Sequence, residues 1–156
     1  MQQVFDDNFE IVDNLQYKTE KAIERLKAFE PEEGYYLAFS GGKDSVTIKS
    51  LADMAGVKYD AHYAITSIDP PELTKFIKKY HPDVIRHAPY TNYYDLIIKK
   101  RMPPTRIVRY CCQELKEEGG QGRFVVTGVR WAESVKRRLT RKEIEFDVYG
   151  SQSKKA

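Results

Sequence analysis

The stretch YYLAFSGGKDSVTIKSLADMAG, from Tyr35 to Gly56, combines an apolar segment, a glycine-rich joint and a second apolar segment. Its first part, Tyr35 to Phe39, has the length and composition of a short buried strand. Its last part, Ser45 to Ala55, has apolar residues at helical spacing, and Gly56 provides a stop signal. The stretch therefore predicts a strand, a loop and a helix in succession.

Strand and helix patterns continue to alternate along the chain. Further strands are predicted at Tyr59–Ile65, Asp83–His87, Arg123–Gly128 and Ile144–Tyr149. Further helices are predicted at Ile11–Phe29, at Tyr93–Lys100 and around Tyr110–Glu118. Another is predicted to open with Asp69, Pro70, Pro71 and Glu72 and to extend to Tyr80, with Asp69 able to cap it and proline in its first turn. This alternation predicts an α/β protein, a Rossmann-like three-layer sandwich. We expect a mostly parallel sheet of about five strands, helices on both faces and an extra N-terminal helix.

The composition is that of one soluble domain. The chain has 156 residues, of which 41% are hydrophobic, which predicts a single domain over residues 1–150 and a disordered polar tail over 151–156. No apolar run reaches about eighteen residues, and the first residues lack the order of a signal peptide. We therefore expect a cytoplasmic protein without a membrane partner. The net charge of +3 favours a local anion site over a polyanion such as RNA.

The glycine-rich joint has the residues of an anion site. Gly41 and Gly42 permit a tight turn that exposes backbone N–H groups, and the following helix directs its positive dipole end to the same place. Ser40 and Ser45 add hydroxyl donors, and Lys43 adds a charge suited to phosphate oxygens. The alternative is a plain strand-to-helix turn in which Asp44 or Ser45 caps the helix. The spacing matches neither the Walker loop nor the dinucleotide fingerprint.

Three loops are expected to meet beyond the carboxyl ends of the strands, where ligands bind in sheets of this kind. They are Ser40–Ser45, Thr66–Glu72 and Gly128–Arg137. Gly128 lets the backbone turn closely over a ligand, Arg130 presents a fork of donors to phosphate or sulfate, and Glu133 is suited to orient an arginine. The basic run that ends at Lys142 is interpreted mainly as a solvated surface.

Four segments resemble known protein families. SGGKDS after YLAF resembles the pyrophosphate-binding loop of the adenine nucleotide alpha-hydrolase superfamily, the ATP pyrophosphatases. TSIDPPEL, RYCCQELK and TGVRWAESVKR resemble segments of the phosphoadenosine phosphosulfate reductase family, and the match extends from Tyr35 to Arg138. The resemblance implies that the phosphates are held by Ser40, Gly41, Gly42, Lys43, Asp44 and Ser45. It also implies that Thr66 lies beside the adenosine and that the far side is completed by Arg109, Lys116, Gly128, Arg130, Glu133 and Arg137.

An enzyme acting at the alpha phosphate is what this resemblance implies first. The ligand would be ATP or phosphoadenylyl sulfate with Mg²⁺, pyrophosphate would leave, and the setting would be sulfur metabolism. Lys43 and Arg130 would stabilise phosphate charge, and Asp44 would help to hold the metal. The alternatives are a sulfonucleotide reductase-like subunit that needs a partner's cysteine, a non-catalytic nucleotide-binding module and, ranked lower, an enzyme of tRNA thiolation.

The sequence also departs from these families. Ile65 stands where an aspartate usually precedes the threonine, and Asp69 is either a replacement for it or a helix cap. No cysteine follows Cys112, so thiol-based reduction by this chain alone is not expected. Cys111 and Cys112 are too few for an iron–sulfur cluster, and the histidines show no zinc-ligand spacing. The short C-terminus indicates either a minimal domain or a chain completed by a protein partner or a homodimer.

Overall fold

A computed structural model describes residues 4–5, 11–12, 14–116, 119–128, 135 and 139. The helices are α1 (Asn14–Ala28), α2 (Lys43–Ala55), α3 (Pro71–Tyr80), α4 (Tyr93–Lys100) and α5 (Tyr110–Leu115). The strands are β1 (Val4–Phe5), β2 (Ile11–Val12), β3 (Tyr35–Ala38), β4 (Tyr59–Ala64), β5 (Ile85–His87) and β6 (Val125–Val126). None of the described helices combines the length and apolar character needed to cross a membrane.

The main sheet has the strand order β5-β4-β3-β6, and every neighbouring pair is parallel. The α/β, Rossmann-like fold predicted from the sequence is therefore confirmed. The described residues supply four strands to this sheet instead of about five. The expected strand Ile144–Tyr149 and the tail 151–156 lie outside the described residues. The strand order reverses at β3, which has β4 on one side and β6 on the other, and such a reversal is where sheets of this kind bind ligands.

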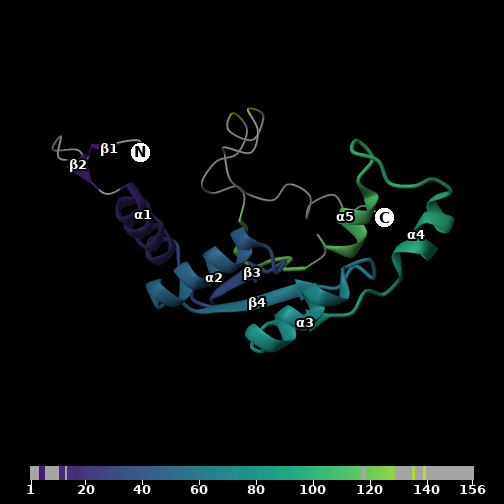
Figure 1. Cartoon of the computed structure of the whole chain (residues 1–156), viewed down its shortest axis with the longest axis horizontal. Helices are drawn as coiled ribbons and strands as arrows, with labels where there is room; N and C mark the ends of the chain where they lie inside the picture. Colours follow the sequence, from purple (N-terminus) through teal and green to yellow (C-terminus); the bar gives the residue numbers. More distant parts are fainter. Residues whose placement is uncertain are drawn as a thin grey trace.

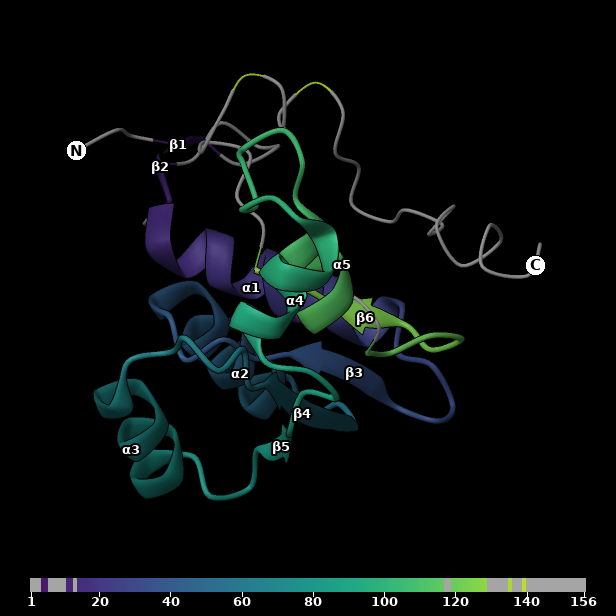
Figure 2. The ribbon, with the colours of Figure 1, turned by 90° about the vertical axis from the view of Figure 1, so that its right-hand side faces the viewer.

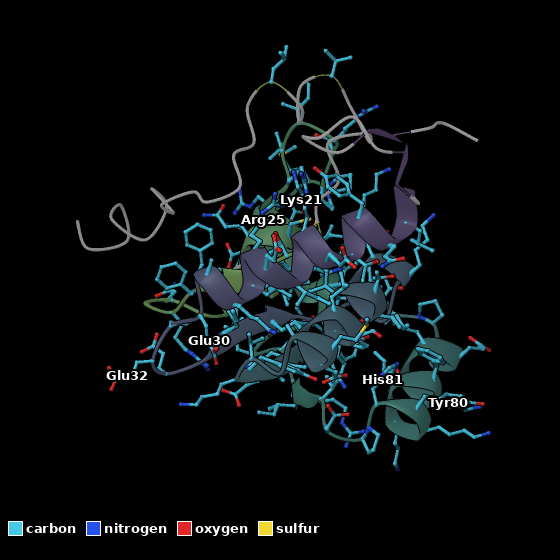
Figure 3. All side chains as sticks on the ribbon, turned by 90° about the vertical axis from the view of Figure 1, so that its left-hand side faces the viewer. Lys21, Arg25, Glu30, Glu32, Tyr80 and His81 are labelled. Atoms are coloured by element: carbon cyan, nitrogen blue, oxygen red, sulfur yellow. The ribbon has the colours of Figure 1, made fainter. Side chains whose placement is uncertain are left out.

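The hydrophobic core lies between one face of this sheet and helices α1 to α3. Burial alternates along β3, so Tyr35 and Leu37 point into the core while Tyr36 is only half-buried. The buried members of this core are Tyr35, Leu37, Phe39, Ala52, Ala55, Val57, Ala61, Tyr63, Ile77 and Val84. Figure 2 shows α2 and α3 on the same side of the sheet. Lys21 and Arg25 lie on the exposed side of α1, which packs against α2 (Figure 3).

A second, smaller cluster joins α4 to α5. Its buried residues are Leu96, Tyr110 and Leu115. Figure 1 shows that both helices lie on the side toward which the arrow of β4 points. The two helices therefore stand at the carboxyl end of the sheet, the end at which the predicted loops meet.

The N-terminal prediction was partly wrong. The predicted helix Ile11–Phe29 begins at Asn14, because Ile11 and Val12 form β2, which pairs with β1 through Phe5↔Ile11 and Val4↔Val12. Residues branched at Cβ favour strands over helix ends. The helix after the glycine-rich joint begins at Lys43, next to the start expected near Asp44.

Candidate functional site

The joint between β3 and α2 leaves a helix N-terminus without a capping side chain. Gly42 is the N-cap of α2, with extended backbone angles of φ −79° and ψ 162°. The interpretation that Asp44 or Ser45 caps this helix is therefore wrong, since both lie inside its first turn. The first N–H groups of any helix lack an acceptor within the helix, and the helix dipole favours an anion there.

Two serine hydroxyls close the joint upon itself. Ser45 Oγ donates to the carbonyl oxygen of Gly42 at 2.9 Å, and Ser40 Oγ donates to Ser45 Oγ at 3.2 Å. Ser45 is buried while Ser40, Gly42 and Lys43 are exposed. The Gly42 N–H also donates to Ser40 Oγ at 3.4 Å, so the joint is held by hydrogen bonds between its own residues while Lys43 is exposed to solvent.

Gly41 is required by both its backbone angle and its surroundings. Its φ of +72° is in the left-handed region that residues with a Cβ rarely adopt. A Cβ at this position would lie 2.6 Å from Leu73 Cδ1 and 3.1 Å from Ile77 Cδ1, both on α3. The joint therefore rests directly on α3, the helix that follows the Thr66 loop.

Gly128 brings the end of the neighbouring strand to the joint. A Cβ on Gly128 would lie 3.1 Å from Asp44 Cβ and 3.2 Å from the Asp44 carbonyl carbon. The backbone after β6 thus passes against the first turn of α2. Two loops predicted to share a site are in contact here.

The Thr66 loop is organised by Asp69. Thr66 is buried, and its backbone N–H donates to Asp69 Oδ2 at 2.7 Å. The prediction that Asp69 caps α3 is wrong, because Pro70 is the N-cap. Ser67 has a left-handed φ of 65°, and its Oγ accepts a hydrogen bond from the backbone N–H of Tyr93 at 2.8 Å. The loop is therefore connected to the start of α4.

The charge of Asp69 is stabilised by its surroundings. Burial by itself would raise the pKa of Asp69, but the backbone and hydroxyl of Thr66, the hydroxyl of Tyr63 and the charge of Lys116 together hold it below its ordinary value. Burial and the nearby carboxylate raise the pKa of Tyr63 to about 12. Within the described part of the chain, neither the Tyr63 nor the Thr66 hydroxyl makes a hydrogen bond of ordinary geometry. Lys116 thus lies near this loop.

Arg109 lies beside the cysteine pair. Its Nη2 donates to Cys112 Sγ at 3.4 Å, and both cysteines are free thiols. Burial and the adjacent Cys112 raise the pKa of the Cys111 thiol. Two thiolates do not fit an iron–sulfur cluster, which takes four protein ligands. The described residues also hold no group of three or more potential metal ligands of the His, Cys, Asp and Glu types.

The predicted site residues fall into three groups. Those in contact with or near the joint and the Thr66 loop are Ser40, Gly41, Gly42, Lys43, Asp44, Ser45, Thr66, Lys116 and Gly128. Arg109 lies beside Cys112, to which it donates a hydrogen bond. Arg130, Glu133 and Arg137 lie outside the described residues. The proximity of the Tyr63 hydroxyl to Asp69 was not predicted from the sequence, because the alternation of residues along a strand predicts only that Tyr63 faces the core.

No protein-family model matches this chain, and no curated protein matches it significantly.

Proposed function

We propose that the chain is a cytoplasmic enzyme that binds ATP or a related adenine nucleotide with Mg²⁺ and acts at the alpha phosphate with release of pyrophosphate. The observation that carries the proposal is the uncapped N-terminus of α2. It stands where the strand order reverses, with Ser40 shortly before it in the chain and Lys43 as the first residue of the helix. A helix N-terminus of this kind binds phosphate groups.

The joint supplies what a phosphate chain requires. Backbone N–H groups and Lys43 would neutralise charge on the leaving pyrophosphate, because preorganised donors stabilise charge that develops in the transition state. Mg²⁺ binds through one or two carboxylates together with phosphate oxygens, and Asp44 in the first turn of α2 fits that donor set. Arg130 is assigned to the same phosphates by the resemblance and by the fork of donors that its guanidinium offers.

The reaction needs no nucleophile from the protein. An acceptor attacks the alpha phosphorus, the bond to the bridging oxygen breaks, and that oxygen leaves with the electron pair as part of pyrophosphate. The chain's contribution would be positioning and electrostatic stabilisation. The resemblance implies that the reaction belongs to sulfur metabolism.

A second candidate is a sulfonucleotide reductase-like subunit. Its support is the resemblance of TSIDPPEL, RYCCQELK and TGVRWAESVKR to the phosphoadenosine phosphosulfate reductase family, and a partner would have to supply the cysteine nucleophile. A third candidate is a module that binds a nucleotide without catalysing a reaction.

The test combines binding with product analysis. Purified protein is incubated with Mg²⁺ and ATP, and separately with phosphoadenylyl sulfate, while AMP, pyrophosphate and sulfite are measured. AMP with pyrophosphate supports the proposal, and sulfite formed only with an added thiol protein supports the reductase-like subunit. Binding without turnover supports the module.

Lys43→Ala should weaken the binding of ATP and of tripolyphosphate about tenfold or more, because one charge-assisted contact to phosphate is lost. Lys78→Ala, which removes an exposed lysine from the body of α3, is the matched control. Equal affinities of the two variants would refute the assignment of the phosphate site.

A further inference from the structure

Asp69 lies where three segments of the chain meet. Its carboxylate accepts the backbone N–H of Thr66 at 2.7 Å, and it lies near Tyr63 on β4 and near Lys116, which follows α5. Thr74 on α3 is close to the same tyrosine. Asp69 is not used as a helix cap, since Pro70 occupies that position. The carboxylate is therefore directed at the loop that leaves β4.

This loop and the phosphate joint leave the sheet at the same edge. The ladder of hydrogen bonds continues beyond each strand, with Phe39 N donating to His62 O at 2.9 Å and Ile65 N to His87 O at 3.0 Å. The residues that follow are Ser40 in one loop and Thr66 in the other. A ligand whose phosphates lie at the joint therefore has the Thr66 loop as a direct neighbour.

The Thr66 loop lies on the β4 side of the joint, and the end of β6 lies on the other side. On the β6 side, Gly128 already approaches Asp44 so closely that an added methyl group would be 3.1 Å from it. The end of β6 and the first turn of α2 are therefore in close contact on that side. Ile65 has no polar group to offer a ligand, and its side chain packs against the hydrophobic core.

We infer that Asp69 is a positioning residue that fixes the Thr66 loop for the nucleoside end of the ligand, an inference that rests on the proposed function. The role is that of a hydrogen-bond acceptor. Without the carboxylate of Asp69, the backbone N–H of Thr66 would lose its acceptor, and Thr66 is only 4% exposed. A buried N–H without an acceptor costs enough free energy to reorganise a loop. The phosphate joint has its own internal hydrogen bonds and does not depend on Asp69.

The experiment compares a nucleotide with its phosphate chain alone. Dissociation constants for Mg²⁺–ATP and for Mg²⁺–tripolyphosphate are measured by calorimetry for the full chain and for three variants. Asp69→Ala removes the acceptor, Asp69→Asn retains an acceptor oxygen without the charge, and Glu72→Ala is the control, an exposed acid in the first turn of α3. The quantity of interest is the preference for ATP over tripolyphosphate.

Asp69→Ala should lower this preference about tenfold while the tripolyphosphate affinity changes less than about threefold. Asp69→Asn and Glu72→Ala should keep the preference within about threefold. An unchanged preference in Asp69→Ala overturns the inference, as does an equal loss of both affinities. If Asp69→Ala does not fold, a tenfold loss of preference in Asp69→Asn overturns it and a retained preference supports it.

Failure of the proposed function gives a different result. If the wild-type chain binds neither ligand, both the proposed function and the inference are refuted. If tripolyphosphate binds in a Lys43-dependent manner and Asp69→Ala leaves the preference unchanged, only the role of Asp69 is refuted.

Discussion

At the residue scale, the joint depends on a glycine that has a left-handed backbone angle and is enclosed by α3. Gly41 has a φ of +72° and lies against Leu73 and Ile77. Gly56, the C-cap of α2, has a similar φ of +68° but open space around its missing Cβ. The two glycines therefore separate the effect of backbone angle from that of crowding.

Gly56→Ala should lower the free energy of unfolding by about 1 to 2 kcal/mol, which is the cost of a left-handed residue with a Cβ. Gly41→Ala should lower it by about 1 to 3 kcal/mol more, because its methyl group would overlap α3. Urea denaturation of both variants measures the difference. Equal losses would show that Gly41 is not enclosed as described.

Sequence reasoning at this scale identified residue types better than residue roles. The joint from Ser40 to Ser45 was recognised because strand, glycines and helix are consecutive in the chain. The role of Asp69 could not be decided from the sequence. A carboxylate just before Pro70 can accept either an N–H of the helix that follows or an N–H of its own loop. Only the folded backbone shows that it accepts the N–H of Thr66.

At the element scale, β6 matters for the site because its end meets the start of α2. Gly128→Ala would bring a methyl group within 3.1 to 3.3 Å of Asp44, which is tighter than ordinary packing. The first turn of α2 would have to move. We expect the dissociation constant for tripolyphosphate to rise about fivefold, equivalent to about 1 kcal/mol.

The control for this prediction is Gly122→Ala in the turn before β6. Gly122 has a φ of +79° and nothing within 4 Å of its missing Cβ, so its replacement strains the backbone away from the joint. It should lower stability without changing tripolyphosphate affinity. If both variants weaken binding equally, the contact between Gly128 and Asp44 is not what positions the phosphate loop.

The half-buried face of the sheet carries a stack of rings across three strands. The ring centroids of Tyr36 and His62 are 4.0 Å apart, those of His62 and His87 are 5.0 Å apart, and His62 Nδ1 lies 2.8 Å from His87 Nε2. One nitrogen of that pair must donate and the other accept. Burial and the neighbouring His87 and Arg123 outweigh Asp60, so the pKa of His62 is below its ordinary 6.5.

This lowered pKa predicts a loss of stability in mild acid. Below the unfolded pKa of 6.5 the unfolded chain takes up a proton that the folded chain resists, so stability present above 6.5 declines as the pH falls toward the folded value. The urea midpoint should drop between about pH 7.5 and about pH 5.5, and His62→Phe should reduce that drop. An equal drop in the variant would contradict this role of His62.

Elements defined by local patterns were predicted best. The helix Tyr93–Lys100 has the bounds expected from its sequence, because Asn92 caps it through its side chain and its apolar spacing is regular. The start of α1 was not predicted, because Ile11 and Val12 form a strand only through pairing with Val4 and Phe5. The spacing of apolar residues within a short segment carries no information about pairing with another segment.

At the scale of the whole molecule, the parallel sheet was predictable and the order of its strands was not. Alternating strands and helices predict parallel pairing, but the placement of β6 beside β3 depends on contacts between residues far apart in the sequence, such as Leu37↔Val126. That placement brings Gly128 to Asp44. The site is therefore a consequence of topology as much as of the SGGKDS motif.

In the proposed function, the phosphates of a nucleotide bind at the N-terminus of α2. The most direct measurement is a titration of the isotope-labelled chain with Mg²⁺–ATP, followed through the backbone amide resonances. The largest shifts should occur at Gly41, Gly42 and residues 43–45, with a second group at residues 66–69 that is absent when tripolyphosphate replaces ATP. Saturation without shifts at residues 41–45 would contradict the account.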